Sequence, residues 1–352
     1  MGGNRNQGIS PSGFMDTLTP QISILTPIGD IIQWFPECLA SIQQQTFKHW
    51  EWIWVGDGVS EATQKKLLEL STQDYRIKVY FQPKVGIAKA LNCGLRFCNS
   101  HYIARVDADD VYPQDRLLLQ YNFLENNPEV GLVSGSVESI SHRADSRGYN
   151  RYIDWMNGIK ISSEIIVNQF IESPIAHPSV MFRKTIVELF GDYPEEGVPE
   201  DYALWLKWLS KGVRMEKIPE VVLFWRDHSD RASLQEVRYS PQAFDRVRIP
   251  TLAEWLKEKK ITHLWIWGAG KNGKQKTKEL VKLGIQFDAW LEVDPKKIGT
   301  YILSKPVYDW NISIPDSVFI LSWVNMATAR EQISTYLESQ GLKAGERYLL
   351  AG

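Results

Sequence analysis

Cysteine is scarce in this sequence, and a long apolar run is missing altogether. The 352 residues include Cys38, Cys93 and Cys98, an odd number whose spacing matches no zinc-binding pattern. A disulfide framework is therefore excluded, and we expect three reduced thiols in a reducing compartment. No run of about 18 apolar residues is present, so we expect no segment that spans a bilayer. We expect a cytoplasmic protein, with peripheral association at the inner face of a membrane left open.

Neither sign of charge dominates the chain. Its 40 Lys and Arg against 42 Asp and Glu give a net charge of −2, which provides no general basic field for nucleic acid. Residues 1–19 are rich in Gly, Asn and Ser and lack the apolar core of a signal peptide, so they are predicted to form a disordered leader. The chain is long enough for two or three globular domains.

Short apolar segments alternate with helical patterns from residue 21 onward. The predicted strands are residues 21–27, 50–55, 77–81 and 102–106, and the predicted helices between them are residues 34–46, 61–70 and 87–98. This alternation predicts an α/β fold with a mostly parallel sheet, whose ligands collect at the carboxyl ends of the strands. Pro27, Asp57 and Asp107 stand at three of those ends, so we expect them to face one crevice.

Two further blocks complete the chain. In the second, we expect helices over 117–126 and 199–211, strands over 130–136, 177–183 and 221–225, and an irregular polar stretch over 140–160. In the third, we expect strands over 264–267, 287–293 and 318–323, with helices that end near Leu283 and begin near Thr328. The predicted division is a leader (1–19), a first domain (20–239), a helical connector (240–260) and a small Rossmann-like α/β domain (261–352).

Three carboxylates follow the fourth strand within four positions, at Asp107, Asp109 and Asp110. Asp107 and Asp109 lie two apart, so in an extended chain their side chains point the same way. Such a pair repels unless a cation lies between its members, and oxygen ligands suit Mg²⁺ or Mn²⁺. The alternative is an acidic turn, with Asp110 at the start of a helix.

Residues 21 to about 235 resemble an inverting glycosyltransferase of family 2, which has the GT-A fold. The resemblance rests on short motifs in the family's order, and they are Ile24-Leu25-Thr26-Pro27, Ser41-Ile42-Gln43-Gln44-Gln45-Thr46, Val55-Gly56-Asp57-Gly58, Gly86-Ile87-Ala88-Lys89-Ala90-Leu91-Asn92-Cys93-Gly94, Asp107-Ala108-Asp109-Asp110, His177-Pro178-Ser179-Val180-Met181, Glu200-Asp201-Tyr202-Ala203-Leu204-Trp205 and Arg226-Asp227-His228.

The resemblance implies transfer of a sugar, with inversion, from a nucleotide-diphospho-sugar. The donor is expected to be a UDP-sugar, the acceptor a glycan or lipid-linked hydroxyl, and the pathway polysaccharide biosynthesis. Asp201 is the implied general base, and Asp109 with His228 the implied ligands of Mn²⁺ or Mg²⁺. The implied donor-nucleotide residues are Thr26, Pro27, Asp57, Lys89, Asp107 and Asp109.

Other interpretations of these side chains stay open. Lys89 is equally well explained as a solvent-facing helix lysine, and Glu200-Asp201 also suits the start of a helix. The candidates for contact with the acceptor are Glu200, His177, Trp205 and Trp155, although core packing is the simpler role for His177 and Trp205. The sequence also departs from the family at Gly56 and Asp30, where the family usually has Asp and Asn.

The third block contains a glycine-rich turn, Gly268-Ala269-Gly270-Lys271-Asn272-Gly273, between a strand and a helix. Such a turn lets a phosphate approach the start of a helix, and Glu292 or Asp294 stands about where a ribose-binding acid is expected. The block resembles the Rossmann-like domains appended to polysaccharide-biosynthesis enzymes. A nucleotide site at Gly268, Gly270, Gly273 and Asp294 competes with a docking or structural role. The rival functions are an NAD(P)-dependent oxidoreductase that uses this turn and a non-catalytic sugar-nucleotide-binding scaffold.

Overall fold

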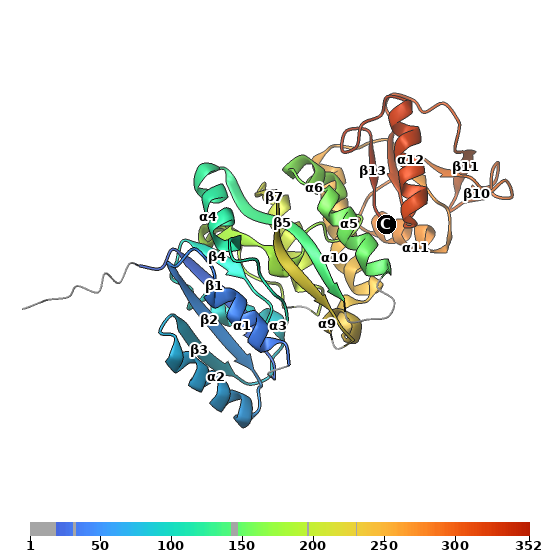
Figure 1. Ribbon diagram of the computed structural model, residues 1–352. Helices are drawn as coiled ribbons and strands as arrows, with labels where there is room; N and C mark the ends of the chain where they lie inside the picture. Colours follow the sequence, from blue (N-terminus) through green and yellow to red (C-terminus); the bar gives the residue numbers. More distant parts are fainter. Residues whose placement is uncertain (1–18, 31–32, 142–146, 196, 230) are drawn as a thin grey trace, which may run out of the picture.

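The computed structural model describes residues 19–30, 33–141, 147–195, 197–229 and 231–352 (Figure 1). Most of the leader predicted over residues 1–19 lies outside these ranges. The strands of the first sheet are β1 (Ile22–Ile28), β2 (Trp50–Asp57), β3 (Ile77–Gln82), β4 (Tyr102–Arg105), β5 (Val130–Ser141), β6 (Met181–Arg183) and β7 (Arg214–Asp227). They are ordered β3-β2-β1-β4-β6-β5-β7.

Within the described residues, β6 is the one strand of this sheet that runs against its neighbours. It pairs antiparallel with β4 and β5, whereas the β1–β2, β1–β4, β2–β3 and β5–β7 pairs are parallel. The carboxyl ends of β1, β2, β4 and β7 therefore share one edge of the sheet. The α/β fold with a mostly parallel sheet that the sequence predicts is confirmed.

Helices cover this sheet because the strands are apolar on both faces. Trp52 and Trp54 of β2 are fully buried, and Trp54 packs edge-on against Phe35. The helices are α1 (Phe35–Gln43), α2 (Glu61–Gln73), α3 (Ile87–Leu95), α4 (Arg116–Asn126), α5 (Arg147–Gly158), α6 (Ser162–Asn168), α7 (Lys184–Phe190), α8 (Glu200–Ser210) and α9 (Ala232–Gln235), with the 3₁₀ helices η1 (His177–Ser179) and η2 (Val237–Tyr239).

The structure corrects three of the expected elements. The stretch expected to be irregular over 140–160 contains helix α5, whose buried Ile153 and Met156 lie at helical spacing. The strand expected over 177–183 starts at Met181, because Pro178 cannot donate to a sheet and lies in η1. The strand expected over 221–225 is the much longer β7, in which pairing with β5 is interrupted near Pro219.

A second sheet follows a long helix, α10 (Pro241–Glu258). Its elements are β8 (Leu264–Trp267), α11 (Lys271–Lys282), β9 (Ala289–Glu292), β10 (Tyr301–Ile302), β11 (Lys305–Asp309), β12 (Phe319–Ser322), α12 (Ala327–Ser339) and β13 (Tyr348–Leu350). The strand order is β10-β11-β9-β8-β12-β13, and all pairs except β10–β11 are parallel. The turn between β8 and α11 thus lies at the centre of a Rossmann-like sheet.

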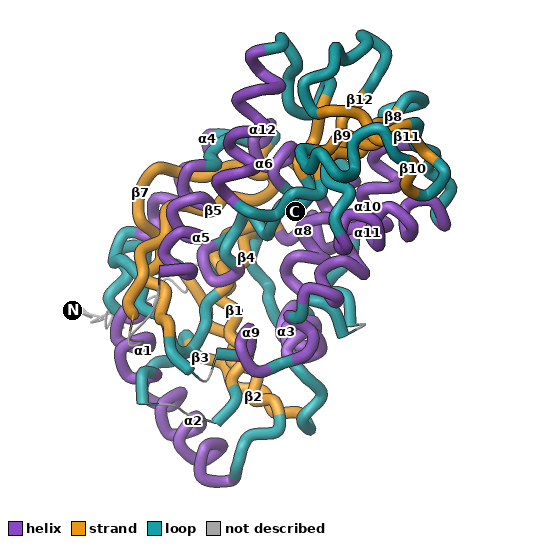
Figure 2. Tube along the Cα trace, turned by 90° about the vertical axis from the view of Figure 1, so that its right-hand side faces the viewer, coloured by secondary structure: helices purple, strands orange, loops and turns teal. Residues whose placement is uncertain are grey.

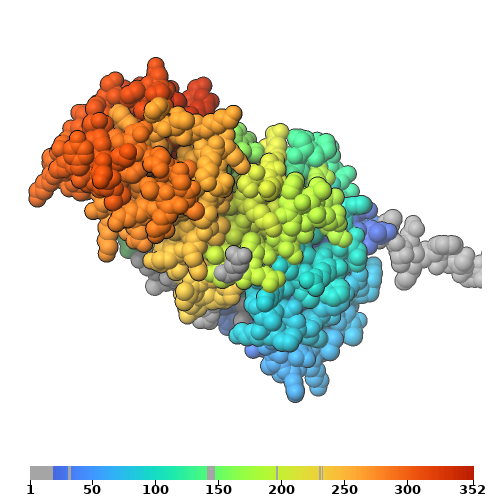
Figure 3. Space-filling model, turned by 180° about the vertical axis from the view of Figure 1, so that it is seen from behind, coloured from blue at the N-terminus to red at the C-terminus, as the bar shows by residue number. Residues whose placement is uncertain are grey.

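The two sheets meet through a shared hydrophobic cluster around α10. Helix α10 contacts α8 on one side and α11 on the other (Figure 2). Phe170, Tyr202 and Leu206 pack with Leu252 of α10 and with Trp290 of the second sheet. In the view from behind, the orange and red second sheet adjoins the yellow and green segments rather than the blue ones (Figure 3). Among the described residues, no helix combines the length and apolar character that a membrane crossing requires.

Candidate active site

Asp107 is held at the end of β4 by a buried arginine. The Arg105 side chain is almost fully buried, and its guanidinium lies 2.6 Å from Oδ1 of Asp107. The two residues lie two apart, so an extended backbone turns both side chains to the same face. Burial raises the pKa of Asp107, and the nearby Arg105 charge opposes that rise. Asp107 is therefore an oriented carboxylate at the sheet edge.

Asp109 is joined to His228, which follows the far end of β7. The imidazole Nε2 of His228 lies 2.9 Å from Oδ2 of Asp109, and the ring packs against Trp34 at a centroid distance of 4.4 Å. Asp109 is partly exposed, whereas His228 is buried. The two implied metal ligands are thus brought together by strands from different parts of the sheet.

Arg226 fixes this junction. Its backbone N–H donates to Oδ1 of Asp110 at 2.8 Å, and its Nε donates to the carbonyl of Asp109 at 2.8 Å. Its guanidinium also lies 2.6 Å from Oε2 of Glu37 in α1. Because one side chain ties β7 to both the acidic turn and α1, the end of β7 has little freedom to move away from the carboxylates.

The acidic turn has the chemistry of a divalent-cation site. Asp107, Asp109 and Asp110 each offer a carboxylate oxygen, and these oxygens lie within 4.8 Å of one another. Oδ2 of Asp110 is buried and has no hydrogen-bond partner within the described residues. Burial raises the pKa of Asp110 well above its ordinary value, since a buried carboxylate without a counter-charge is unfavourable. A cation with oxygen ligands, such as Mg²⁺ or Mn²⁺, fits these residues.

Glu200 and Asp201 form the first turn of α8, close to this cluster. The N–H of Tyr202 donates to Oδ1 of Asp201 at 2.7 Å, and the Tyr239 hydroxyl donates to Glu200 at 3.0 Å. Burial raises the pKa of Asp201 to about 6, and the charge of Asp107 adds to that rise. Burial and the neighbouring Asp201 raise the pKa of Glu200 to about 8. A carboxylate with a pKa near neutrality is suited to accept a proton.

The four acceptor candidates lie in different environments. His177 is buried, its Nε2 lies 2.8 Å from the Tyr193 hydroxyl, and burial lowers its pKa well below the ordinary value. Trp205 is 1% exposed and packs against His177 and Trp208, so its ring has no free face for a sugar. The Glu200 carboxylate is also buried. Trp155 of α5 is partly exposed and stacks near Tyr152, so it keeps surface that a ligand can reach.

Asp57 organises the loop before α3. Its carboxylate accepts hydrogen bonds from the backbone N–H groups of Val85 and Gly86, both at 2.9 Å, and from the Gln82 amide at 3.0 Å. These three bonds occupy three of its roughly four acceptor positions. Lys89 in the first turn of α3 lies 3.8 Å from Glu195 and is half exposed, which leaves both of its interpretations open.

The contacts of Thr26 in β1, and of Gly56 and Asp30, where the sequence departs from the family pattern, are defined by neighbouring side chains. The Thr26 hydroxyl is buried and accepts from the Trp52 indole at 2.9 Å, so it is directed away from the strand end, whereas Pro27 is partly exposed. A Cβ on Gly56 would come 2.7 Å from the Phe81 ring, so Phe81 fills the space of the missing Asp side chain. Asp30 accepts from Ser60 and Thr63 at the start of α2, which is a structural role.

The glycine-rich turn of the second sheet is tightly packed. Gly268 has a φ of +101°, and a Cβ on Gly273 would lie 2.1 Å from the Gly268 carbonyl, so both positions require glycine. A Cβ on Gly270 would meet nothing. Glu292 accepts from the N–H of Ala269 at 3.1 Å, and Lys297 reaches both Glu292 and Asp294. The acids expected to bind a ribose are thus engaged within the fold.

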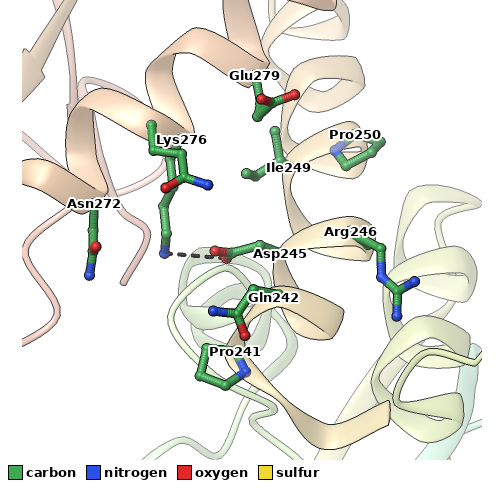
Figure 4. Close-up of a pocket in the computed structure, with 10 residues that line it drawn as sticks. Pro241, Gln242, Asp245, Arg246, Ile249, Pro250, Asn272, Lys276 and Glu279 are labelled. Carbon is green, nitrogen blue, oxygen red and sulfur yellow. Dashed lines mark ion pairs between the residues drawn. The ribbon is translucent and has the colours of Figure 1, made fainter. Parts of the chain in front are cut away.

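A cavity of about 490 Å³ lies beside this turn, between α10 and α11. Figure 4 shows that Lys276 of α11 points across it to Asp245 of α10, at 3.2 Å. Asp245 also pairs with Arg248 at 3.3 Å. Asp245 and Lys276, which both line the cavity, tie the two helices together by a polar contact in addition to the shared cluster.

Several site residues escape prediction from the sequence. Arg105, Trp34 and Tyr239 contact Asp107, His228 and Glu200, respectively. Arg105 had a usable signal, because a charged residue inside an apolar strand, two positions before Asp107, must point toward the same side. Trp34 and Tyr239 lie far along the chain from their partners, and no local pattern reveals such contacts.

Comparison with known proteins identifies the family. The family model "Glycosyl transferase family 2" matches residues 23–190. The amylovoran biosynthesis glycosyltransferase AmsE of Erwinia amylovora is 32% identical over 197 residues, which cover 55% of this chain and 71% of AmsE. The chain belongs to glycosyltransferase family 2. It is therefore a sugar-transferring enzyme, and the oxidoreductase alternative is not favoured.

Other family members and a solved structure agree. The Escherichia coli UDP-Gal:alpha-D-GlcNAc-diphosphoundecaprenol beta-1,3-galactosyltransferase is 29% identical over 217 residues, which cover 61% of this chain and 77% of that enzyme. Residues 1–349 of S. aureus TarS, in complex with UDP-GlcNAc, superpose with a TM-score of 0.55 at 16% identity, over 74% of this chain and 71% of that chain. The chain spans 43% of a longer TarS chain. The likeness to TarS confirms the GT-A fold.

Proposed function

We propose that this family 2 enzyme transfers a sugar from a UDP-sugar to the hydroxyl of a glycan or lipid-linked acceptor, with inversion and with help from a divalent cation. The observation that carries the proposal is the convergence of a base-like carboxylate, Asp201, with the oriented carboxylates Asp107 and Asp109. The sequence-related AmsE and the E. coli galactosyltransferase support a role in polysaccharide biosynthesis and a UDP-linked donor.

Asp201 acts as the general base in this proposal. It takes the proton of the acceptor hydroxyl as that oxygen bonds to the anomeric carbon and the bond from this carbon to the diphosphate oxygen breaks. The Tyr202 N–H, which donates to Oδ1, fixes the direction of the carboxylate. Its raised pKa brings the base close to the working pH, where general-base catalysis contributes most. Glu200, raised further, stays protonated beside it near neutrality.

Asp109 and His228 hold the cation, Mn²⁺ or Mg²⁺, in this proposal, and Asp107 contacts the donor's ribose or sugar. The bound cation supplies Lewis-acid stabilisation of the negative charge on the leaving diphosphate. The short His228–Asp109 contact and the unpartnered Asp110 oxygen support this assignment. Asp57, Lys89 and the backbone at Thr26 and Pro27 bind the rest of the nucleotide, and Trp155 is the acceptor candidate with accessible ring surface.

The carboxyl-terminal part has a structural role in this proposal, with the division at residues 20–239, 240–260 and 261–352. The internal engagement of Glu292 and Asp294 supports packing rather than nucleotide binding. The shared cluster around α10 supports the same role.

Thermal unfolding with UDP tests the proposal. UDP should raise Tm in the presence of Mn²⁺ and much less in its absence, while NAD(H) should have no effect. A response to NAD(H) alone would overturn the proposal. A screen of UDP-sugars for Mn²⁺-dependent release of UDP would then identify the donor, and loss of that release in Asp201→Asn would separate an enzyme from a binding scaffold.

A further inference from the structure

Just beyond the end of β7, Arg231 lies against two neighbouring aromatic rings whose centroids are 5.3 Å apart. Its guanidinium carbon is 4.7 Å from the ring centre of Tyr149 in α5 and 4.6 Å from that of Trp225 in β7. The side chain is only 13% exposed, although it belongs to a loop. A cation packed against two rings is partly desolvated and restricted in orientation.

The position of Arg231 is restricted by the contacts that Arg226 and His228 make with the acidic turn. Those residues contact Asp110 and Asp109 directly, and Arg231 follows His228 by three positions, so its Cα lies at most about 11 Å from that of His228. Burial raises the pKa of Asp107 and Asp110, and the Arg231 charge is among those that oppose the rise. Arg231 therefore lies near the carboxylates as well as against Tyr149 of α5.

The guanidinium is weakly paired for such an enclosed charge. Its one ion pair among the described residues is with Oδ1 of Asp227, at 3.8 Å, which is longer than a hydrogen bond. The buried Tyr149 hydroxyl lies within reach of the Arg231 guanidinium and has no other hydrogen-bond partner within the described part of the chain. Buried polar groups are normally hydrogen-bonded, so this pair of side chains has donors that suit an incoming anion.

We propose that Arg231 binds a phosphate oxyanion of the substrate, with the Tyr149 hydroxyl as a second donor. The proposal rests on the proposed function. A planar guanidinium presents two parallel N–H groups to phosphate oxygens, and its contact with the two rings lowers the cost of ordering it. The phosphate belongs either to the donor nucleoside diphosphate or to a diphosphate on a lipid-linked acceptor.

Binding of UDP and of uridine, both with Mn²⁺ and the full chain, tests the donor source. Arg231→Met should weaken UDP binding about tenfold or more by calorimetry, and leave uridine binding unchanged. Arg231→Lys keeps the positive charge but loses the two parallel N–H groups of the guanidinium. Its Kd for UDP should therefore lie between the values of the wild type and of Arg231→Met. Arg214→Met, at the other end of β7 and half exposed, is the matched control and should bind UDP like the wild type.

The acceptor source predicts a different result. Arg231→Met would then leave the Kd for UDP unchanged but raise KM about tenfold or more for an acceptor sugar carrying a lipid diphosphate, and not for the same sugar as a methyl glycoside. Unchanged values in both arms would overturn the inference and leave a packing role. Where Arg231→Met does not fold, Arg231→Lys decides by the same criteria. Failure of the wild type to bind UDP would instead overturn the proposed function.

Discussion

His228 and Asp109 are 119 positions apart in the chain, yet Nε2 of one lies 2.9 Å from Oδ2 of the other. The contact exists because β7, the last strand of the first sheet, ends at the same edge as β4. The geometry of the cluster therefore depends on the closure of the whole sheet by β7 and not on the acidic turn alone.

Loss of either member of this pair should weaken the cation dependence of donor binding. Asp109→Asn and His228→Gln should each reduce the Mn²⁺-dependent Tm shift by UDP, because each removes a proposed ligand of the cation. The double variant should lose no more than the worse single variant, since the two side chains act as one unit. Additive losses would show that they act separately. His263→Gln, a half-exposed histidine of the second sheet, is the control.

Asp201→Asn should lower kcat at least about 100-fold and leave the Kd for UDP unchanged. The amide cannot take a proton from the acceptor, whereas the donor is held by other residues. Steady-state kinetics and calorimetry on one preparation measure both quantities. Asp316→Asn, on the exposed surface, should match the wild type. Near-normal turnover in Asp201→Asn would remove Asp201 from the role of base.

The pH dependence of kcat should report Asp201. The active form is the carboxylate, and burial raises its pKa to about 6, so activity should fall as the pH drops through about 6. An ordinary Asp would give this fall near pH 4. A profile of kcat from pH 4.5 to 8.5, at saturating donor and cation, measures the midpoint. A midpoint near pH 4 would contradict the environment described for Asp201.

Glu200 should make the fold less stable as the pH rises. Burial raises its pKa to about 8 in the folded state, against about 4.3 when unfolded, so the folded state binds more protons in between. Its contribution is fully present below about pH 4 and is lost as the pH rises through about 8. The difference in Tm between Glu200→Gln and the wild type should therefore change by about 2 °C or more in favour of the variant when the pH rises from 5 to 9. An unchanged difference would contradict the raised pKa.

Gly56 should not accept a side chain while Phe81 is in place. Gly56→Ala should cost about 1–3 kcal/mol of the free energy of unfolding, because the new Cβ would meet the Phe81 ring at 2.7 Å. Adding Phe81→Ala should recover most of that loss. Gly158→Ala is the control, since its Cβ would meet no atom. Equal losses at Gly56 and Gly158 would show that the ring moves aside freely.

The sequence is sufficient to predict the first four strands and the edge at which Pro27, Asp57 and Asp107 lie. Each of these strands is rich in apolar residues and is followed by a turn signal, and parallel strands must end on one side. The resemblance then supplied His228 and Asp201, whose positions depend on long-range pairing that no local pattern encodes.

Helix α5 shows where such prediction failed. Tyr149, Tyr152, Ile153 and Met156 have helical spacing, but the exposed polar residues between them hide it from a scan for apolar runs. The length of β7 was missed for another reason, because Pro219 and the irregular pairing beside it interrupt the alternation. The contact between Arg231 and Tyr149, which belongs to α5, cannot be predicted from the sequence either.

The cluster that joins α8, α10 and the second sheet has a consequence for how the enzyme can change. Helix α8 carries Asp201 in its first turn, and its reverse face is packed against residues that the carboxyl-terminal half supplies. A gene fusion that exchanged the second sheet would have to exchange α10 with it, or else replace the side chains by which α8 packs against α10 and the second sheet. A destabilising mutation in the second sheet would then shift α8 and misplace the carboxylate of Asp201, while binding of the donor at the acidic turn would be preserved.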